Sequence, residues 1–144
     1  MVKPFYLLDT SVISEGIKVD PNIPLMKKLF EKSRLSQIPS PVWHELVYGM
    51  NYLSDGVLKE LIRDYLMSVV APHFSIMQYD DRAAWIHADI RARLEKQGLS
   101  APVVACQIAS IAVSNNMILV TKNPNDYKNI VDNSTLQIEN WEEE

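Results

Sequence analysis

Short apolar segments recur along the chain and have the length of buried strands. The segments at residues 5–8 and 117–120 are wholly apolar, which is typical of strands covered on both faces of a parallel sheet. Three further segments, at residues 35–38, 74–77 and 136–138, are shorter or more mixed in composition. The pattern therefore predicts five strands.

Apolar residues at helical spacing fill the intervals between the predicted strands. They predict helices over residues 24–32, 40–53, 54–69, 80–97 and 102–113. The last of these segments is small and apolar almost all round, as expected of a helix buried against a sheet. Strands that alternate with helices indicate an α/β fold, here a three-layer fold with a mainly parallel central sheet flanked by helices.

Several predicted helices have one apolar side. The helix over residues 54–69, with Ser54 as its N-cap, carries a broad apolar stripe that faces the core or a partner. The helix over residues 80–97 begins at an Asp pair and is terminated by Gly98. Its expected buried residues are Ala84, Trp85, Ala88 and Leu94. Those expected for the helix over residues 24–32 are Leu25, Leu29 and Phe30.

The composition fits a folded cytoplasmic protein. The 144 residues suit one domain over residues 1–144, and 47% apolar against 22% charged residues provides enough apolar surface for a core. The single cysteine, Cys106, excludes an internal disulfide. We expect no membrane anchor, because the sequence has no charged-then-apolar leader and no long apolar run. The net charge of -4 neither suggests nor excludes nucleic acid as a partner.

Polar side chains follow the two most apolar strands. Asp9 comes directly after the first, and Asn123 and Asp126 lie in the loop after the second. Because the carboxyl ends of parallel strands share one edge of a sheet, we expect these residues to converge. Glu45 lies early in a helix among apolar or small neighbours, so its carboxylate is expected to point into the fold or a cleft. Three carboxylates with amide and hydroxyl neighbours suit Mg²⁺ or Mn²⁺ rather than Zn²⁺.

Each of these acidic residues also has a plainer interpretation. Asp9 could cap a helix, Glu45 could be a solvated first-turn acid, and Asp126 could stabilise its own turn. A zinc-protease interpretation of His44 and the following Glu fails on spacing. The second His of that motif would stand three residues after the Glu, where this chain has Tyr48.

The order of these motifs resembles that of the PIN-domain ribonucleases, especially the VapC toxins of bacterial toxin–antitoxin pairs. Such proteins open with an apolar strand ending in Asp-Thr or Asp-Ser, as at residues 6–14, followed by a helix of the type Glu-Leu-x-x-Gly, as at residues 45–49. A small-residue helix (residues 108–112), a strand and polar loop (residues 119–127) and a closing strand (residues 138–141) complete the similarity. The resemblance therefore covers nearly the whole chain.

The resemblance implies a metal-dependent endoribonuclease with a cognate VapB-type antitoxin. In such an enzyme, carboxylates hold one or two Mg²⁺ or Mn²⁺ ions, which activate a bound water and neutralise charge on the scissile phosphate. By the resemblance, Asp9, Glu45 and Asp126 are the metal ligands. The supporting residues are Thr10, Thr121 and Asn123. The expected substrate is structured RNA such as tRNA or rRNA, and the expected assembly is a homodimer.

Binding an RNA backbone also requires cations at the rim of the site. The candidates are Lys27, Lys28, Lys32, Arg34, Lys122 and Lys128. Taken singly, each of them is also consistent with an ordinary solvated side chain.

One position departs from the family pattern. The family normally has an Asp three residues before the Ile108-Ala109 pair, and this chain has Ala105 there. A methyl group binds no cation, so the resemblance implies an inactive variant at this position. Two origins are open, namely a naturally degenerate member or a toxin whose acid was replaced to make it tolerable to its host. The alternative function is a catalytically dead PIN-like domain that binds an antitoxin, RNA or another protein.

Overall fold

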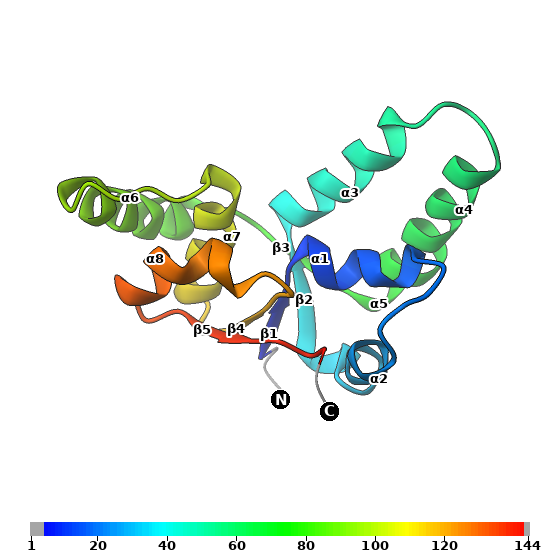
Figure 1. Ribbon diagram of the computed structural model, residues 1–144, viewed down its shortest axis with the longest axis horizontal. Helices are drawn as coiled ribbons and strands as arrows, with labels where there is room; N and C mark the ends of the chain where they lie inside the picture. Colours follow the sequence, from blue (N-terminus) through cyan, green and yellow to red (C-terminus); the bar gives the residue numbers. More distant parts are fainter. Residues whose placement is uncertain (1–4, 143–144) are drawn as a thin grey trace.

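Five parallel strands form the centre of the computed structural model, which describes residues 5–142 (Figure 1). Their order across the sheet is β3-β2-β1-β4-β5, and every neighbouring pair is parallel. Each strand lies within a residue of a segment predicted from the sequence. The strands are β1 (Tyr6–Leu8), β2 (Ser36–Pro39), β3 (Ser75–Met77), β4 (Ile118–Val120) and β5 (Gln137–Glu139).

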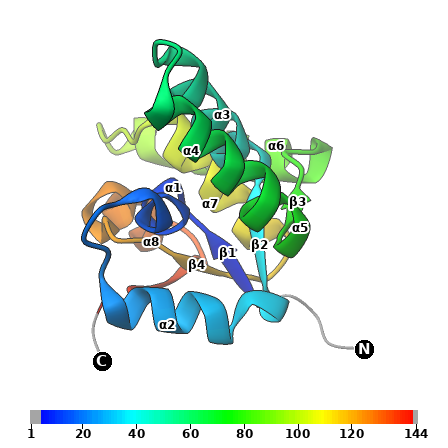
Figure 2. The same ribbon diagram turned by 90° about the vertical axis from the view of Figure 1, so that its right-hand side faces the viewer.

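Helices flank the sheet, so the predicted α/β fold is confirmed. They are α1 (Thr10–Ile13), α2 (Ile23–Glu31), α3 (Ser40–Tyr52), α4 (Val57–Tyr65), α5 (Ala71–His73), α6 (Asp81–Lys96), α7 (Val103–Ser114) and α8 (Lys128–Asp132). Short 3₁₀ segments span Ser14–Ile17, Ser33–Leu35 and Pro124–Tyr127. Helices α3 and α4 form a hairpin on one side of the molecule, and α6 packs against α7 on the other (Figures 1 and 2).

The helix predicted over residues 54–69 differs from the observed one at both ends. Its N-cap is Gly56 rather than Ser54, and it continues through a π-helical turn at Leu66–Val70 into α5. Of the predicted apolar stripe, Leu66 is buried and Ile62 and Tyr65 pack against the core. The part of the stripe at Val57, Leu58 and Leu61 is exposed and has no cover within the described part of the chain.

Two large side chains that the sequence placed in the core lie at the surface. Trp85 is 81% exposed, because α6 turns Ala83, Ile90 and Leu94 towards the core instead. Of the residues predicted to be buried on this helix, only Leu94 is buried. Phe30 of α2 is 84% exposed, although its predicted companions Leu25 and Leu29 are buried. In both helices the apolar residues form two adjacent rows, and only one row faces the core, which α6 reaches by packing against α7.

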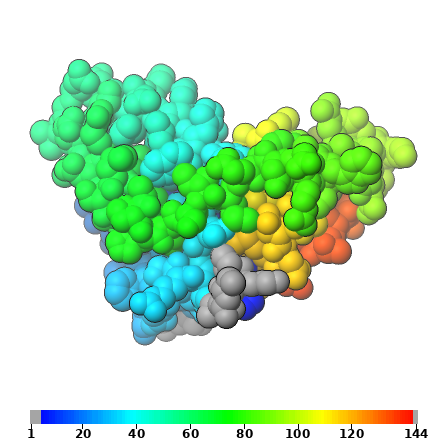
Figure 3. Space-filling view, turned by 180° about the vertical axis from the view of Figure 1, so that it is seen from behind, coloured from blue at the N-terminus to red at the C-terminus, as the bar shows by residue number. Residues whose placement is uncertain are grey.

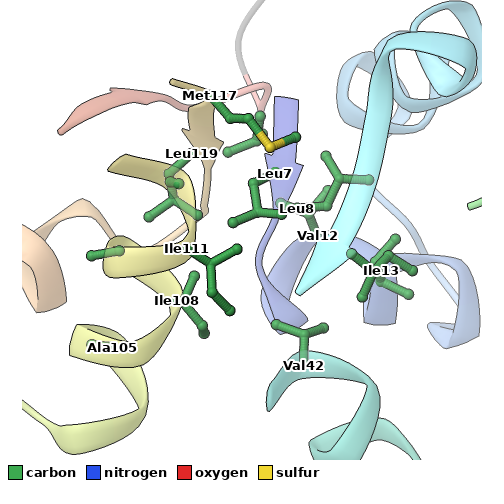
Figure 4. Close-up of a cluster of buried hydrophobic side chains, with 14 of the residues drawn as sticks. Leu7, Leu8, Val12, Ile13, Val42, Ala105, Ile108, Ile111, Met117 and Leu119 are labelled. Carbon is green, nitrogen blue, oxygen red and sulfur yellow. The ribbon is translucent and has the colours of Figure 1, made fainter. Parts of the chain in front are cut away.

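The core surrounds β1 and α7. Leu7 and Leu8 have no exposed surface, with Ile111 of α7 on one side of them and Ile13 of α1 on the other (Figure 4). Almost the whole of α7 from Ala105 to Ala112 is buried, as its small apolar composition predicts. The described part of the chain contains no helix that is both long and apolar enough to cross a membrane.

Candidate active site

The candidate site lies where the sheet changes its direction of winding. From β1 the chain passes to β2 and β3 on one side, whereas β4 and β5 lie on the other. In open parallel sheets, the crevice beyond the carboxyl ends of the strands at such a point is the usual binding site. Asp9 follows β1 and Thr121 follows β4, and the Asp9 N–H donates to Val120 O at 3.0 Å. The predicted convergence of these two loops is therefore observed.

Both carboxylate oxygens of Asp9 are held by the protein. The Thr10 N–H donates to Oδ1 at 2.8 Å, and the Thr121 hydroxyl donates to Oδ2 at 2.8 Å. Thr121 is completely buried, and its Oγ1 also accepts the Asn123 N–H at 3.0 Å. Burial raises the pKa of Asp9 above its ordinary value, and the hydrogen bonds oppose that rise. A carboxylate fixed in this way is oriented before any ligand arrives.

Tyr127 is a site residue that the sequence alone did not identify. It is buried, it hydrogen-bonds Asp9, and both Asp9 and Asp126 act electrostatically on its phenol. Burial raises the pKa of Tyr127 well above its ordinary value, so the phenol remains a donor at neutral pH. Helix α7 contacts the 3₁₀ segment Pro124–Tyr127 that carries this phenol. The only signal in the sequence was an aromatic residue directly after Asp126.

Asp126 lies on the 3₁₀ segment Pro124–Tyr127 and is exposed. Its N–H donates to Asn123 O at 3.1 Å, so the turn is locally closed. Asp126 lies close enough to Asp9 to raise the pKa of that carboxyl further. The loop thus brings a second carboxylate to the site, and Asn123 supports Thr121 through its backbone N–H.

Glu45 lies on α3, which starts directly after β2, and its side chain is half-buried. Within residues 5–142, no three His, Cys, Asp or Glu side chains are grouped so that they could hold a metal ion. The expected three-carboxylate site of Asp9, Glu45 and Asp126 is therefore not assembled. The assembled unit is the pair formed by Asp9 and Asp126, and a pair alone is a poor site for a hard divalent cation.

Ala105 lies in the first turn of α7 and is 8% exposed. Figure 4 shows it on α7 at the same end as Ile108, with Val42 of α3 across from it. The neighbouring Cys106 is also buried, and burial raises the pKa of its thiol, so a thiolate nucleophile is disfavoured. The side chain at position 105 is therefore a buried methyl group in the first turn of α7.

A hollow lies at this edge of the molecule, whereas the predicted RNA-binding cations are divided between the two edges of the sheet. The space-filling view shows the outline hollowed between the α3–α4 hairpin and the α6–α7 pair (Figure 3). Lys128 is exposed and directly follows the Pro124–Tyr127 segment of the site. Lys32 instead lies 5.4 Å from the ring centre of Tyr6, the first residue of β1, and therefore at the opposite edge of the sheet. Lys122, a predicted RNA-binding cation, instead donates to Glu15 at 2.6 Å. Its ammonium group is therefore engaged in an ion pair within the fold.

The fold and the site agree with one protein family. The PIN domain family matches residues 6–131, and the chain therefore belongs to this family. Within the family it is similar to VapC-type toxins. Ribonuclease VapC2 of Rickettsia felis is 28% identical over 138 residues, which are 95% of this chain and 98% of that protein. Toxin FitB of Neisseria gonorrhoeae is 28% identical over 127 residues, covering 84% of this chain and 89% of that protein.

Solved structures show the same similarity. VapBC2 from Rickettsia felis, bound to a DNA fragment from their promoter, matches with a TM-score of 0.80 and 26% identity over 95% of this chain and 98% of that chain. FitAB bound to an IR36 DNA fragment matches with a TM-score of 0.86 over 97% of each chain, and its 22% identity supports the fold alone.

Proposed function

We propose that this chain is the toxin of a VapBC-type pair, built as an endoribonuclease for structured RNA such as tRNA or rRNA, with a metal centre that is incomplete at Ala105. The proposal rests on the relatives named above and above all on the Asp9 carboxylate. That carboxylate ends β1 at the point where the sheet changes direction, and both of its oxygens are oriented by donors. In this proposal Asp9, Asp126 and an acid at position 105 form the metal site. Glu45, which the structure does not group with Asp9 and Asp126, acts as a water-mediated ligand.

The first test is the response of the folded protein to divalent ions. Ala105→Asp adds a carboxylate near Asp9 and Asp126, so the metal-free protein becomes less stable through like-charge repulsion. Mg²⁺ or Mn²⁺ then stabilises the variant by ~2.7 kcal/mol at a hundredfold excess over its dissociation constant. For a chain of this length that is a rise in Tm of roughly 5–10 °C, measured by differential scanning calorimetry.

The matched control is Ala92→Asp, which adds the same charge at an exposed position of α6. Neither this variant nor the unaltered chain should show a comparable rise. An equal rise in all three proteins would show that the ion binds elsewhere and would refute the metal site.

An antitoxin partner is supported by apolar surface that the chain leaves open. A mainly apolar groove lies between α2 and the segment from Tyr65 to Phe74. It is lined by Met26, Leu29, Phe30, Tyr65, Val69 and Phe74, together with the polar Ser33 and His73. Such a groove fits an extended or helical antitoxin segment, because most of the affinity then comes from apolar contact. In this proposal the exposed Phe30 side chain contacts the antitoxin in the groove. The acidic site offers a second contact, an antitoxin Arg bound by the carboxylates.

We expect the double variant Glu45→Gln, Asp126→Asn to bind the cognate antitoxin about tenfold more weakly, a loss of ~1.4 kcal/mol. The complex should survive, since the apolar groove is unchanged. Isothermal titration calorimetry measures the change, and Glu95→Gln on the exposed face of α6 is the control. If the double variant and the control bind equally well, no antitoxin Arg enters the acidic site.

The uncovered α4 stripe supports a homodimer. Val57, Leu58 and Leu61 are all more than half exposed, and a second copy of the chain could cover them. Light scattering at tens of micromolar should give twice the chain mass of 16.4 kDa. Leu61→Glu should shift the protein towards the monomer. A monomer mass for the unaltered chain would contradict this assembly.

The second candidate function is a catalytically dead PIN-like domain that acts only by binding. The observation that favours it is that, within residues 5–142, no third acid is grouped with Asp9 and Asp126. Both candidates bind an antitoxin, and they differ in the result of restoring the acid. A dead module stays without activity and without a metal response in Ala105→Asp, whereas an incomplete nuclease gains both.

A further inference from the structure

Glu15 is a buried carboxylate that the proposed site does not include. It lies in the 3₁₀ segment that follows α1 and is 2% exposed. Its Oε1 accepts from Lys122 Nζ at 2.6 Å and lies 3.3 Å from Lys18 Nζ. Its Oε2 accepts the Asn22 N–H at 2.6 Å. Both oxygens are therefore used, as burial of a charged group requires.

Lys122, the ion-pair partner of Glu15, lies in the middle of the Thr121–Asn123 loop, which hydrogen-bonds Asp9. The preceding residue, Thr121, donates its hydroxyl to Asp9 Oδ2, and the following residue, Asn123, donates its N–H to Thr121 Oγ1. The N–H of Lys122 donates to Ser11 Oγ at 3.1 Å, while its ammonium donates to Glu15 and lies 3.8 Å from Glu142 Oε2. One three-residue loop thus connects Glu15 to the Asp9 carboxylate.

The segment that carries Glu15 is itself anchored to the rest of the fold. The Tyr65 hydroxyl donates to Ile13 O at 2.8 Å. The Tyr65 ring also fills the space beside Gly16, where any Cβ would collide with the ring hydroxyl. Residues on both sides of Glu15 in this segment are therefore held from the α4 side. Glu15 is a fixed point against which the Thr121–Asn123 loop can be positioned.

We propose that Glu15 is a positioning residue for the candidate active site, acting through Lys122 to keep the Thr121 hydroxyl on Asp9. This inference rests on the proposed function for its catalytic consequence. A purely structural role would need only charge neutralisation, which the more exposed Lys18 already provides from the same segment. The additional hydrogen bond from Lys122 instead comes from the Thr121–Asn123 loop after β4 and orders that loop.

Amide hydrogen exchange measured by NMR tests the inference without any enzymatic assay. Glu15→Gln and Lys122→Met should each accelerate exchange of the Lys122 and Asn123 amides about tenfold relative to the α6 amides, as expected for loss of one charge-assisted hydrogen bond. Lys122→Arg should retain most of the protection, because it preserves the charge. The control Lys18→Met removes the other cation on Glu15 and should leave these amides unchanged.

A second readout uses the Ala105→Asp background. Adding Lys122→Met there should weaken Mn²⁺ binding, measured by calorimetry, about tenfold and lower kcat for tRNA with little change in KM. Unchanged loop exchange in Lys122→Met would overturn the inference, and so would equal acceleration throughout the chain, which means global destabilisation. Lys122→Met keeps the Lys18 contact of Glu15. Its loop exchange therefore tests the inference even if Glu15→Gln does not fold. Failure of Ala105→Asp to cleave RNA would refute the proposed function but not the exchange result.

Discussion

Ala105→Asp is expected to cleave RNA in the presence of Mg²⁺ or Mn²⁺ at least about a hundredfold faster than the unaltered chain. The factor follows from the loss that a metal site suffers when a direct ligand is absent, which exceeds the 10–100-fold effect of removing an outer partner. Residue 105 is almost completely buried on α7, which contacts the 3₁₀ segment of Asp126 and Tyr127. In the proposed site, a carboxylate at position 105 joins Asp9 and Asp126.

Initial rates on total tRNA, with and without chelator, measure this effect. The unaltered chain should show no cleavage above the chelator blank. The Ala92→Asp control should behave in the same way, since its added charge lies on the exposed face of α6. Equal, metal-dependent cleavage by all three proteins would show that position 105 does not belong to the metal site.

Glu15→Gln should lower the free energy of unfolding by about 3 kcal/mol at pH 7. Removing Glu15 leaves Lys122 with only its longer, 3.8 Å contact to Glu142, and breaking a buried ion pair costs several kcal/mol. Glutamine has nearly the same shape as glutamate, so the loss of stability reflects the lost charge rather than altered packing. Urea denaturation measures the free energy of unfolding. The control is Glu95→Gln, whose exposed pair with Arg91 should contribute less than about 1 kcal/mol.

This stabilisation should depend on pH in a defined direction. The hydrogen bond from Lys122 lowers the pKa of Glu15 from 4.5 to about 2 against the opposing effect of burial. Because the pKa of the folded state lies below that of the unfolded state, the stabilisation is complete above about pH 4.5 and is lost as the pH falls towards 2. The difference between the unaltered chain and Glu15→Gln should shrink over this interval. A constant difference from pH 7 to pH 2 would contradict the assignment.

The sequence predicted the features that depend on local patterns. Apolar runs are strong signals for strands, and sites in parallel sheets lie at the carboxyl ends of the strands. Together these two regularities were enough to predict that Asp9 lies beside the loop after β4. The contact of Thr121 with Asp9 also agrees with the motif order. The departure at Ala105 stays a prediction.

Features that depend on distant contacts were not predictable. The closest cation to the buried Glu15 is Lys122, which lies 107 residues later, and no local sequence pattern predicts that pairing. For the same reason the sequence alone suggests RNA binding for Lys122, whereas in the fold this side chain pairs with Glu15. Trp85 was placed in the core because its helix has two adjacent apolar rows, and the packing of α6 on α7 decides between them. Tyr127 was missed because its contact with Asp9 exists only in the folded chain.

The central claim is that Asp9 and position 105 belong to one divalent-ion nuclease centre. The most direct measurement is tRNA cleavage in Mg²⁺ by three proteins, namely the unaltered chain, Ala105→Asp, and Ala105→Asp combined with Asp9→Asn. We predict cleavage by Ala105→Asp alone, abolished by chelator. Cleavage by the unaltered chain at the same rate, or full activity in the double variant, would contradict the claim.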